Sequence, residues 1–493
     1  MANAPFDAES RACRAAQILW MNRDIKARLQ CVRSFRHSLV AAADELTAAV
    51  EADVGRPPAE VLGSDVLPLA DAARYLEKQA ASLLAPRRTA GPPLSLFGQR
   101  DWVYRRPWGV VGIIGIWNYP LFLNGVQILQ ALVAGNGVLW KPSELGGKSA
   151  ALLVRLLHNA GLPHELVQLL PSTREAGPQL LEADIDHLIF TGSAAVGRQI
   201  AKRLGERLIP STLELSGCDA MFVVQDADVE FAAKAAWFGM TLNRGQTCLA
   251  VRRIFVAKSI APKFNAAMRH HLECAEPLKL ATASQVRLME SLIQDAIAKN
   301  GDAAKPTLCN GWASDERGAV PHIIFNATPE MAICQVDCFA PVAAVMEFNT
   351  IEQALDMESR CSFALGASIF TSDTKTAKHL ASQLRAGMVS INDVIANTTH
   401  QATPFGGRGS SGWGVTQGAE GLVAMTMPQV VSVRRGRFRP HFDGATPALE
   451  KLVRGILNWS HAPRFGQRLR GLWKTIRGLV AVSRGRKKTP GRG

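Results

Sequence analysis

The chain has 493 residues, of which 47% are apolar and 20% charged, so we expect a folded globular protein rather than a disordered or fibrous one. Residues 434–493 carry sixteen Lys and Arg against two acidic residues, which is the whole net charge of +14, and the first 433 residues are neutral. This distribution argues against a general nucleic-acid-binding protein, because only the C-terminal segment could supply the positive charge.

The cysteines and the N-terminal stretch indicate the compartment. Nine irregularly spaced cysteines do not predict a disulfide framework and fit a reducing environment. The first residues show no basic segment followed by an apolar block, so we expect no secretory signal and a cytoplasmic protein. Cys334 and Cys338 are four residues apart, but no second pair and no suitably spaced histidines complete a site, so no metal is expected.

Helices are expected first along the chain, over about residues 8–85. A strand is predicted at "RDWVYRRP". The apolar run that follows is divided into a strand, "GVVGIIGIW", a break at "NYP" and a helix, "LFLNGVQILQALVAG", rather than a membrane span. Strands and helices then alternate, and the pattern begins again near Leu213. The sequence therefore predicts an α/β protein with doubly wound parallel sheets in two successive units.

The loops after the predicted strands carry the candidate nucleotide-binding residues, because open α/β sheets bind nucleotides at the carboxyl ends of their strands. A glycine there allows close backbone approach, and a helix N-terminus favours a phosphate group. Each loop taken singly is also compatible with an ordinary connection. The candidates are Asn118 after the first buried strand, Lys141 and Glu144 after the next, and Gly192, Ser193 and Gly197 where "FTGSAAVG" leads from a strand into a helix.

Glu214 and Cys248 are the candidate catalytic residues. Glu214 lies between leucines in "LELSG", where burial would raise the pKa of its carboxyl group into the range of a general base. Cys248, in "GQTCLA", is either a buried packing residue, as most free cysteines are, or a nucleophile. With the Asn118 amide, this thiol and carboxylate are the parts needed for covalent catalysis on a carbonyl group.

The chain contains "WNYP", "KPSE", "FTGSxxVG", "LELxG", "GQTCLA", "FAPV" and "PFGGRGSSGWG". In order and spacing these motifs resemble the NAD(P)-dependent aldehyde dehydrogenase superfamily, most closely its fatty and aromatic aldehyde dehydrogenase branch. The resemblance implies a Rossmann-like cofactor domain over residues 1–212, a catalytic α/β domain over 213–395, a return segment with a β oligomerisation strand over 396–434, and the basic tail over 435–493.

The resemblance also implies an assembly and a mechanism. A hairpin around residues 93–107 would pair with the strand "QVVSVRR", and the family usually forms dimers or tetramers. Cys248 would attack the aldehyde, while the Asn118 amide and the Cys248 backbone N–H stabilise the oxyanion. Hydride transfer to the nicotinamide would leave a thioester, which Glu214 helps water to hydrolyse. We therefore expect oxidation of a lipophilic or aromatic aldehyde to its carboxylate.

The cofactor implied by the resemblance is NAD, with NADP as the alternative that related branches also accept. Lys141 and Glu144 would hold the adenosine ribose hydroxyls, and Glu144 would repel a 2′-phosphate. Asp337 would contact the nicotinamide ribose, and Ser193 the pyrophosphate. The full set of implied cofactor contacts is Trp117, Lys141, Glu144, Gly192, Ser193, Gly197, Asp337 and Phe339.

Three departures from the family pattern predict a divergent member. Asp337 stands where the family commonly has a glutamate one methylene longer. Ser216, Gly217 and Cys218 replace a common Gly-Gly-Lys, and Val415 with Thr416 replaces the usual Arg-Glu after "SGWG". None of these removes a catalytic group, but together they suggest an unusual substrate or slower turnover.

The basic tail is predicted to form two amphipathic helices separated by Pro463. An apolar stripe opposite Arg and Lys is typical of a helix lying on an anionic membrane, here the inner face, and the segment is too short and too charged to span a bilayer. Docking on the enzyme or on a partner subunit is the alternative, and nucleic acid is the least favoured partner because aromatic platforms are lacking. The stripe consists of Leu449, Leu452, Val453, Ile456 and Leu457, then Phe465, Leu469, Leu472, Trp473, Ile476, Leu479 and Val480.

Two other functions remain open. A coenzyme A-acylating relative would release the same thioester to a thiol, but it needs no hydrolytic base, so Glu214 argues against it. A catalytically weak family member could serve as a membrane-attached scaffold, but Cys248, Asn118 and Glu214 are all present.

Overall fold

The computed structural model describes residues 5–93, 96–273, 275–306, 316–436 and 438–487. The chain divides into two compact units. The first comprises residues 1–84 and 106–427, and the second comprises residues 85–105 and 428–493.

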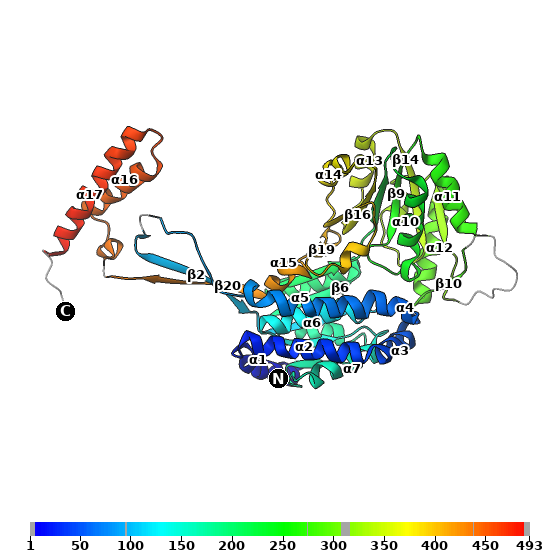
Figure 1. Cartoon of the computed structure of the whole chain (residues 1–493), viewed down its shortest axis with the longest axis horizontal. Coiled ribbons are helices and arrows are strands. Elements are labelled where there is room, and N and C mark those ends of the chain that lie inside the picture. Colours follow the sequence, from blue (N-terminus) through cyan, green and yellow to red (C-terminus); the bar gives the residue numbers. More distant parts are fainter. Residues whose placement is uncertain (1–4, 94–95, 274, 307–315, 437, 488–493) are drawn as a thin grey trace. The chain divides into compact units, whose positions relative to one another are not determined.

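The first unit begins with the predicted helical region. Its amphipathic helices bury Trp20, Phe35 and Leu46 in one core with the apolar helix α6 (Phe122–Ala134), and this core covers one face of the first sheet (Figure 1). The Asp24 side chain accepts a hydrogen bond from the Lys26 backbone N–H and so starts the second of these helices. The helices are α1 (Asp7–Met21), α2 (Ile25–Ala41), α3 (Ala43–Val54), α4 (Pro58–Val61), a π-helical turn (Leu62–Val66) and α5 (Leu67–Leu83).

The first sheet has the strand order β19-β7-β6-β3-β4-β5, and all of its strands are parallel except β19. The order reverses between β3 and β6, which is where open α/β sheets form a ligand crevice. The strands are β3 (Val110–Ile114), β4 (Gly137–Lys141), β5 (Val167–Leu169), β6 (His187–Gly192), β7 (Ser211–Leu215) and β19 (Gly412–Trp413); the helices between them are α6 (Phe122–Ala134), α7 (Gly147–Asn159), α8 (Ala176–Glu182) and α9 (Ala194–Arg207).

The second sheet repeats this pattern with the order β11-β13-β14-β9-β8-β16-β17, and separate apolar cores cover its two faces. Its strands are β8 (Asp219–Val223), β9 (Val251–Ala257), β11 (Asp302–Ala304), β13 (His322–Phe325), β14 (Val342–Phe348), β16 (Gly366–Phe370) and β17 (Met388–Ile391). Its helices are α10 (Val229–Thr241), α11 (Ala261–Glu273), α12 (Ala283–Ala298), α13 (Ile351–Ser359) and α14 (Thr374–Ala381). The predicted α/β class with two doubly wound sheets is confirmed.

Short elements complete the first unit. They are the 3-10 turns at Leu242–Gly245, Ala332–Cys334 and Ala396–Thr399, the strands β10 (Leu278–Lys279), β12 (Gly318–Ala319), β15 (Phe363–Ala364) and β18 (Arg408–Gly409), and the helix α15 (Gly418–Ala424).

The second unit holds a small sheet and the C-terminal helices. The sheet has the order β1-β2-β20, built from β1 (Arg87–Arg88), β2 (Gln99–Pro107) and β20 (Thr426–Arg434). The predicted pairing of a hairpin with "QVVSVRR" is therefore present, although the hairpin starts earlier than residue 93 and residues 94–95 lie outside the described residues. Beyond a 3-10 turn (Pro440–Asp443), α16 (Pro447–His461) and α17 (Phe465–Lys487) lie side by side (Figure 1).

The two predicted tail helices are thus present, and they are separated at Pro463 as expected. The final predicted basic residues, 488–493, lie outside the described part of the chain. Within the described residues, no helix combines the length and the apolarity that crossing a membrane requires.

The loop before β9 has an unusual backbone. Asn243, Arg244 and Gly245 have φ values of 49°, 60° and 73°, three consecutive residues in the left-handed region that only glycine adopts without strain. A Cβ atom on Gly245 would lie 2.5 Å from the Ala340 carbonyl carbon and oxygen. The Arg252 guanidinium donates hydrogen bonds to the carbonyl groups of both Gly245 and Ala340, so this loop is fixed against the second sheet.

We expect Gly245→Ala to lower the free energy of unfolding by about 3 kcal/mol, because it combines backbone strain with a clash against backbone atoms. The matched control is Gly205→Ala in α9, where nothing lies within 4 Å of an added Cβ atom and alanine improves helix propensity. Urea unfolding of both variants measures the difference. Equal midpoints for the two variants would contradict the packing described for this loop.

Candidate active site

Asn118 lies in the loop after β3 and is 1% exposed. Its side-chain Nδ2 donates to the Gln246 carbonyl oxygen at 3.0 Å, and its Oδ1 accepts from the Tyr119 backbone N–H at 3.1 Å. The amide is therefore fixed against the loop that carries Cys248, with its second N–H hydrogen still available to a ligand.

A buried charge pair supports this loop from the N-terminal helices. The Arg56 guanidinium forms an ion pair with Asp65 and donates to the Asn118 carbonyl oxygen at 3.2 Å. Asp65 in turn accepts from the backbone N–H groups of Leu121 and Phe122 at 3.0 and 2.9 Å. This pair could not be predicted from the sequence, because Arg56 and Asp65 stand among many charged residues of a helical region and no local pattern marks them as buried.

Cys248 is half-buried, in the loop between α10 and β9. Its carbonyl oxygen accepts from the Gly217 backbone N–H at 3.2 Å, which ties it to the loop after β7. Its side chain lines two cavities. One is shared with Asn118, Glu214 and Phe339, and the other is apolar. Cys248 therefore lies where two separate approaches meet.

Burial raises the pKa of the Cys248 thiol well above its usual range, and the nearby carboxyl groups of Glu214, Asp219 and Asp337 act in the same direction. A thiol in this state is protonated at neutral pH, so it reacts as a thiolate only when a base removes its proton.

Glu214 has the properties of such a base. Burial raises the pKa of its carboxyl group to about 7, against the opposing effect of hydrogen bonds from Thr416 and Gln127. Thr416 Oγ1 donates to Glu214 Oε2 at 3.4 Å, and Gln127 Nε2 does so at 3.3 Å. Glu214 Oε1 is buried without a hydrogen-bond partner among the described residues. One carboxylate oxygen is thus left for a proton, near neutral pH.

The contacts of Gln127 and Thr416 with Glu214 could not be predicted from the sequence. Thr416 is marked only as a departure from the family pattern, and Gln127 only as a polar residue inside an apolar helix with buried neighbours.

The candidate cofactor residues form two groups on the carboxyl edge of the first sheet. Lys141, at the end of β4, forms an ion pair with Glu144; the lysine side chain is 5% exposed and the glutamate side chain 47%. Ser193 caps α9, its hydroxyl accepting from the Val196 backbone N–H at 3.4 Å. Gly197 lets α9 pack tightly on β7, since an added Cβ atom would lie 2.6 Å from Leu215 Cδ2.

These residues fit a dinucleotide. The ammonium and carboxylate of Lys141 and Glu144 offer a donor and an acceptor to a pair of ribose hydroxyl groups. The first turn of α9, beside Gly192 and Ser193, offers backbone N–H groups to a phosphate. The start of α9 follows β6, which adjoins the point where the strand order reverses, and the Lys141–Glu144 pair follows β4, the strand beyond β3.

Near Cys248, Trp117 and Phe339 contact each other with ring centroids 6.1 Å apart. Burial raises the pKa of the Asp337 carboxyl group to about 6, and a hydrogen bond from Ser216 opposes the shift. Two departures from the family pattern, Ser216 and Asp337, therefore contact each other.

The structure thus brings Cys248, Asn118, Glu214 and Phe339 to one cavity. It places the Lys141–Glu144 pair and the start of α9 further along the same edge of the first sheet, at the ends of β4 and β6.

The apolar cavity at Cys248 is formed by uncharged side chains only, among the residues that the structure describes. Polar groups on its wall are hydroxyl groups and the Gln417 amide. The apolar wall includes Phe122, Leu123, Phe238, Leu249, Ile395 and Phe405.

The chain is similar to known proteins over most of its length. A model of the aldehyde dehydrogenase family matches residues 2–431. The 4,4′-diapolycopene aldehyde oxidase of a Methylomonas species is 32% identical over 435 residues, which cover 86% of this chain and 81% of that protein. A Mycobacterium tuberculosis protein, whose name proposes an NADP(+) succinate-semialdehyde dehydrogenase, is 30% identical over 88% of this chain and 85% of its own. The NAD+ complex of a Bacillus cereus aldehyde dehydrogenase has a TM-score of 0.81 at 26% identity, covering 87% of this chain and 89% of that one.

We expect Thr416→Val to move the pH dependence of aldehyde-dependent NADH formation upward by about one unit, because it removes a hydrogen bond that lowers the pKa of Glu214. The base form accumulates as pH rises through about 7, so the rate at pH 7 falls roughly fivefold while the rate at high pH is kept. Thr416→Ser retains the hydroxyl group and serves as the control. A pH profile of Thr416→Val that coincides with the wild type would rule out this contact.

Proposed function

The chain belongs to the aldehyde dehydrogenase family, as its seven motifs predicted, and we propose that it oxidises an uncharged, lipophilic or aromatic aldehyde to the carboxylate at Cys248. The observation that carries this proposal is the position of Cys248 between two cavities, one shared with Glu214 and Asn118 and the other apolar and uncharged.

In this mechanism Glu214 takes the proton of the Cys248 thiol, and the thiolate adds to the aldehyde carbon to form a thiohemiacetal. The Asn118 amide and the Cys248 backbone N–H donate to the developing oxyanion. Bound NAD supplies the acceptor for the hydride that leaves this carbon. Glu214, once it has released the thiol proton to solvent, accepts a proton from a water molecule, which attacks the resulting thioester. Glu214 returns that proton to the departing Cys248 thiolate, and the acid product loses its own proton to solvent and leaves as the carboxylate.

The substrate class follows from the wall of the apolar cavity. A semialdehyde, which carries a carboxylate at its far end, would lose the hydration of that carboxylate there without a cation among the described lining residues to pair with, which is costly in an apolar site. An uncharged chain or ring would instead gain from contact with Phe122, Phe238 and Phe405. Among the relatives, the name of the Methylomonas protein refers to diapolycopene aldehyde.

NADH formation across a panel of aldehydes tests this proposal. We expect catalytic efficiency with a long-chain or aromatic aldehyde to exceed that with succinate semialdehyde at least tenfold. Added coenzyme A should not raise the rate, because Glu214 supplies the base for hydrolysis. Preference for the semialdehyde would refute the substrate class, and an acyl-coenzyme A product would favour the acylating alternative. Absence of turnover with every aldehyde would favour the scaffold alternative.

Cys248→Ala should reduce this activity to less than a few per cent and leave cofactor binding nearly intact, since the thiol is the only group that bonds to the substrate. The control is Cys31→Ala, another free cysteine, on α2, which should retain full activity. Residual turnover comparable to the control would show that Cys248 is not the nucleophile.

NAD is the proposed cofactor in preference to NADP. Lys141 holds Glu144 at the end of β4, where its carboxylate would accept from ribose hydroxyl groups and repel a 2′-phosphate. The ratio of kcat/KM for NAD over NADP should exceed one and should fall roughly tenfold in Glu144→Gln, which keeps an acceptor and removes the charge. A wild-type ratio at or below one would refute the preference.

Two further proposals concern location and assembly. The small sheet of β1, β2 and β20 supports a homodimer or tetramer, because β20 exposes Val430, Val431 and Val433 on its surface. The basic tail supports a cytoplasmic enzyme held at the inner face of an anionic membrane, from which a lipophilic aldehyde would reach Cys248.

A further inference from the structure

The two C-terminal helices pack against each other through glycines. A Cβ atom on Gly455 would lie 2.4 Å from the Thr475 backbone nitrogen, and one on Gly471 would lie 2.3 Å from the Trp459 backbone nitrogen. One on Gly478 would lie 2.6 Å from Leu452 Cα. As the residue numbers increase along α16, the numbers of the residues they contact on α17 decrease, so the two helices are antiparallel. At these positions the two backbones are in direct contact. We call this contact the glycine seam; it comprises Leu452, Gly455, Trp459, Gly471, Thr475 and Gly478.

Because glycines bring the two backbones together, the large apolar side chains of the amphipathic pattern other than Leu452 remain outside the seam. In an ordinary helical hairpin such a stripe would form the buried contact. Here Leu457 is 59% exposed, Phe465 75% and Trp473 57%, and the exposed set also includes Val453, Leu469, Ile476 and Val480.

These exposed stripes share one face of the hairpin. Successive side chains advance about 100° around a helix. On α16 the exposed stripe of Val453 and Leu457 therefore follows the seam by roughly 150°, and the half-buried Ile456 lies between the stripe and the seam. On α17 the stripe that runs from Leu469 through Trp473 to Val480 follows its seam in the same rotational sense. Since the helices are antiparallel, equal rotations bring both stripes to the same side.

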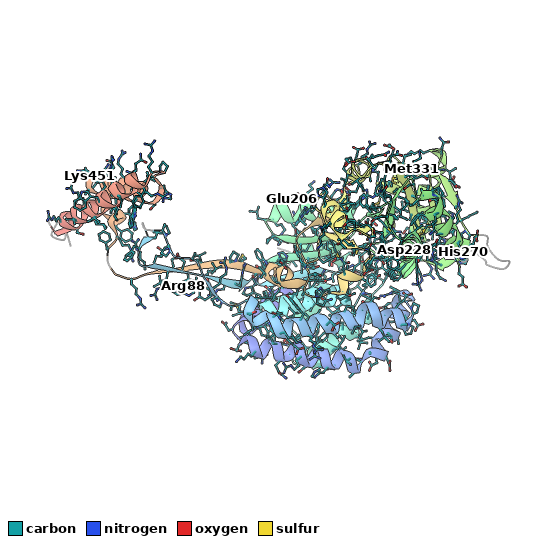
Figure 2. All side chains as sticks on the ribbon, turned by 45° about the horizontal axis from the view of Figure 1, so that its top comes forward. Arg88, Glu206, Asp228, His270, Met331 and Lys451 are labelled. Carbon is teal, nitrogen blue, oxygen red and sulfur yellow. The ribbon has the colours of Figure 1, made fainter. Side chains whose placement is uncertain are left out.

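The opposite rotation brings the basic residues together. Five of the basic residues, Lys451 and Arg454 on α16 and Arg470, Lys474 and Arg477 on α17, precede the seam by roughly 100°, so they gather on the other side of the hairpin. Figure 2 labels Lys451 among the side chains that project from this hairpin. Residues 447–484 carry eight basic side chains and one acidic side chain. Glu450, the acidic one, is paired with Arg454.

Trp473 and Arg477 lie at the border between the apolar face and the basic face of the hairpin. The Arg477 guanidinium lies over the Trp473 ring, 4.9 Å from the ring centroid. An indole with a cation beside it, at the border of an apolar surface, matches the level where lipid headgroups meet acyl chains.

We propose that the face formed by Val453, Leu457, Phe465, Leu469, Trp473, Ile476 and Val480 lies in the headgroup–acyl boundary of an anionic bilayer as one preformed surface. This inference deepens the proposed membrane location and rests on it. A lipid surface is favoured over a protein partner because the apolar face is bordered by an excess of cations, which complements anionic headgroups generally rather than one particular arrangement of charges.

The test is co-sedimentation of full-length protein with vesicles of phosphatidylcholine containing 30% phosphatidylserine, against phosphatidylcholine alone. We expect binding to the anionic vesicles at low salt. Leu469→Ser with Trp473→Ser should weaken that binding roughly tenfold or more, since both lost side chains belong to the apolar face. Ile18→Ser with Leu19→Ser is the matched control, because it removes two exposed apolar side chains of α1 and should bind as the wild type does.

A second pair of variants tests the seam. Gly471→Leu adds an apolar side chain but forces the two helices apart, so we expect weaker binding to vesicles if the face must be preformed. If the apolar content of the tail were all that mattered, the same variant would bind more strongly. Gly466→Leu adds the same group where nothing lies within 4 Å of a Cβ atom and should not weaken binding. The inference would be overturned if Gly471→Leu, or the variant that combines Leu469→Ser with Trp473→Ser, bound anionic vesicles as strongly as the wild type.

The remaining outcomes separate this inference from the proposed chemistry. Turnover of a short soluble aldehyde should be unchanged in all four hairpin and control variants. If full-length protein stays in the supernatant with anionic vesicles, the membrane inference fails while aldehyde oxidation stands. If the variant that combines Leu469→Ser with Trp473→Ser changes the oligomeric state in solution and leaves vesicle binding unchanged, the face is a protein interface and the inference is likewise overturned.

Discussion

The buried carboxyl group of Glu214, hydrogen-bonded by the neutral donors Gln127 and Thr416, is the interaction on which the proposed chemistry depends. A cation at that distance would stabilise the carboxylate and lower its proton affinity, whereas neutral donors leave burial as the dominant effect. The Cys248 thiol, whose own pKa is raised, then has a proton acceptor matched to neutral pH. The apolar cavity that meets this site at Cys248 is likewise lined by uncharged side chains among the residues that the structure describes.

The fold delivers these groups from separate sheets. Asn118 comes from the loop after β3 and Glu214 from the end of β7 in the first sheet, and Cys248 precedes β9 of the second. Their mutual position therefore depends on contacts between loops: Asn118 to the Gln246 carbonyl group, and Gly217 to the Cys248 carbonyl group. Buried arginines complete the support from both sides, since Arg56 holds the Asn118 loop and Arg252 holds the loop before Cys248.

The candidate catalytic and cofactor residues could be predicted mainly where they lie at or just after the end of a strand. The strand–helix alternation, both doubly wound sheets and the two tail helices could be predicted, because hydrophobic periodicity and Pro463 determine them locally. The roles of Arg56, Gln127 and Thr416 could not, since each contacts the site from an element distant in sequence. In the tail the apolar stripe was visible, but the glycine seam was not. A residue without a side chain gives no hydrophobic signal, and the contact shows only when two backbones are placed together.

The glycine seam also determines how the tail would associate with and leave a surface. An isolated amphipathic helix orders as it binds, and the entropy of that ordering is set against the affinity. In α16 and α17 the helices already contact each other through their backbones, so association would be the docking of a preorganised body. On a lipid surface, such a body would bind and dissociate without folding or unfolding.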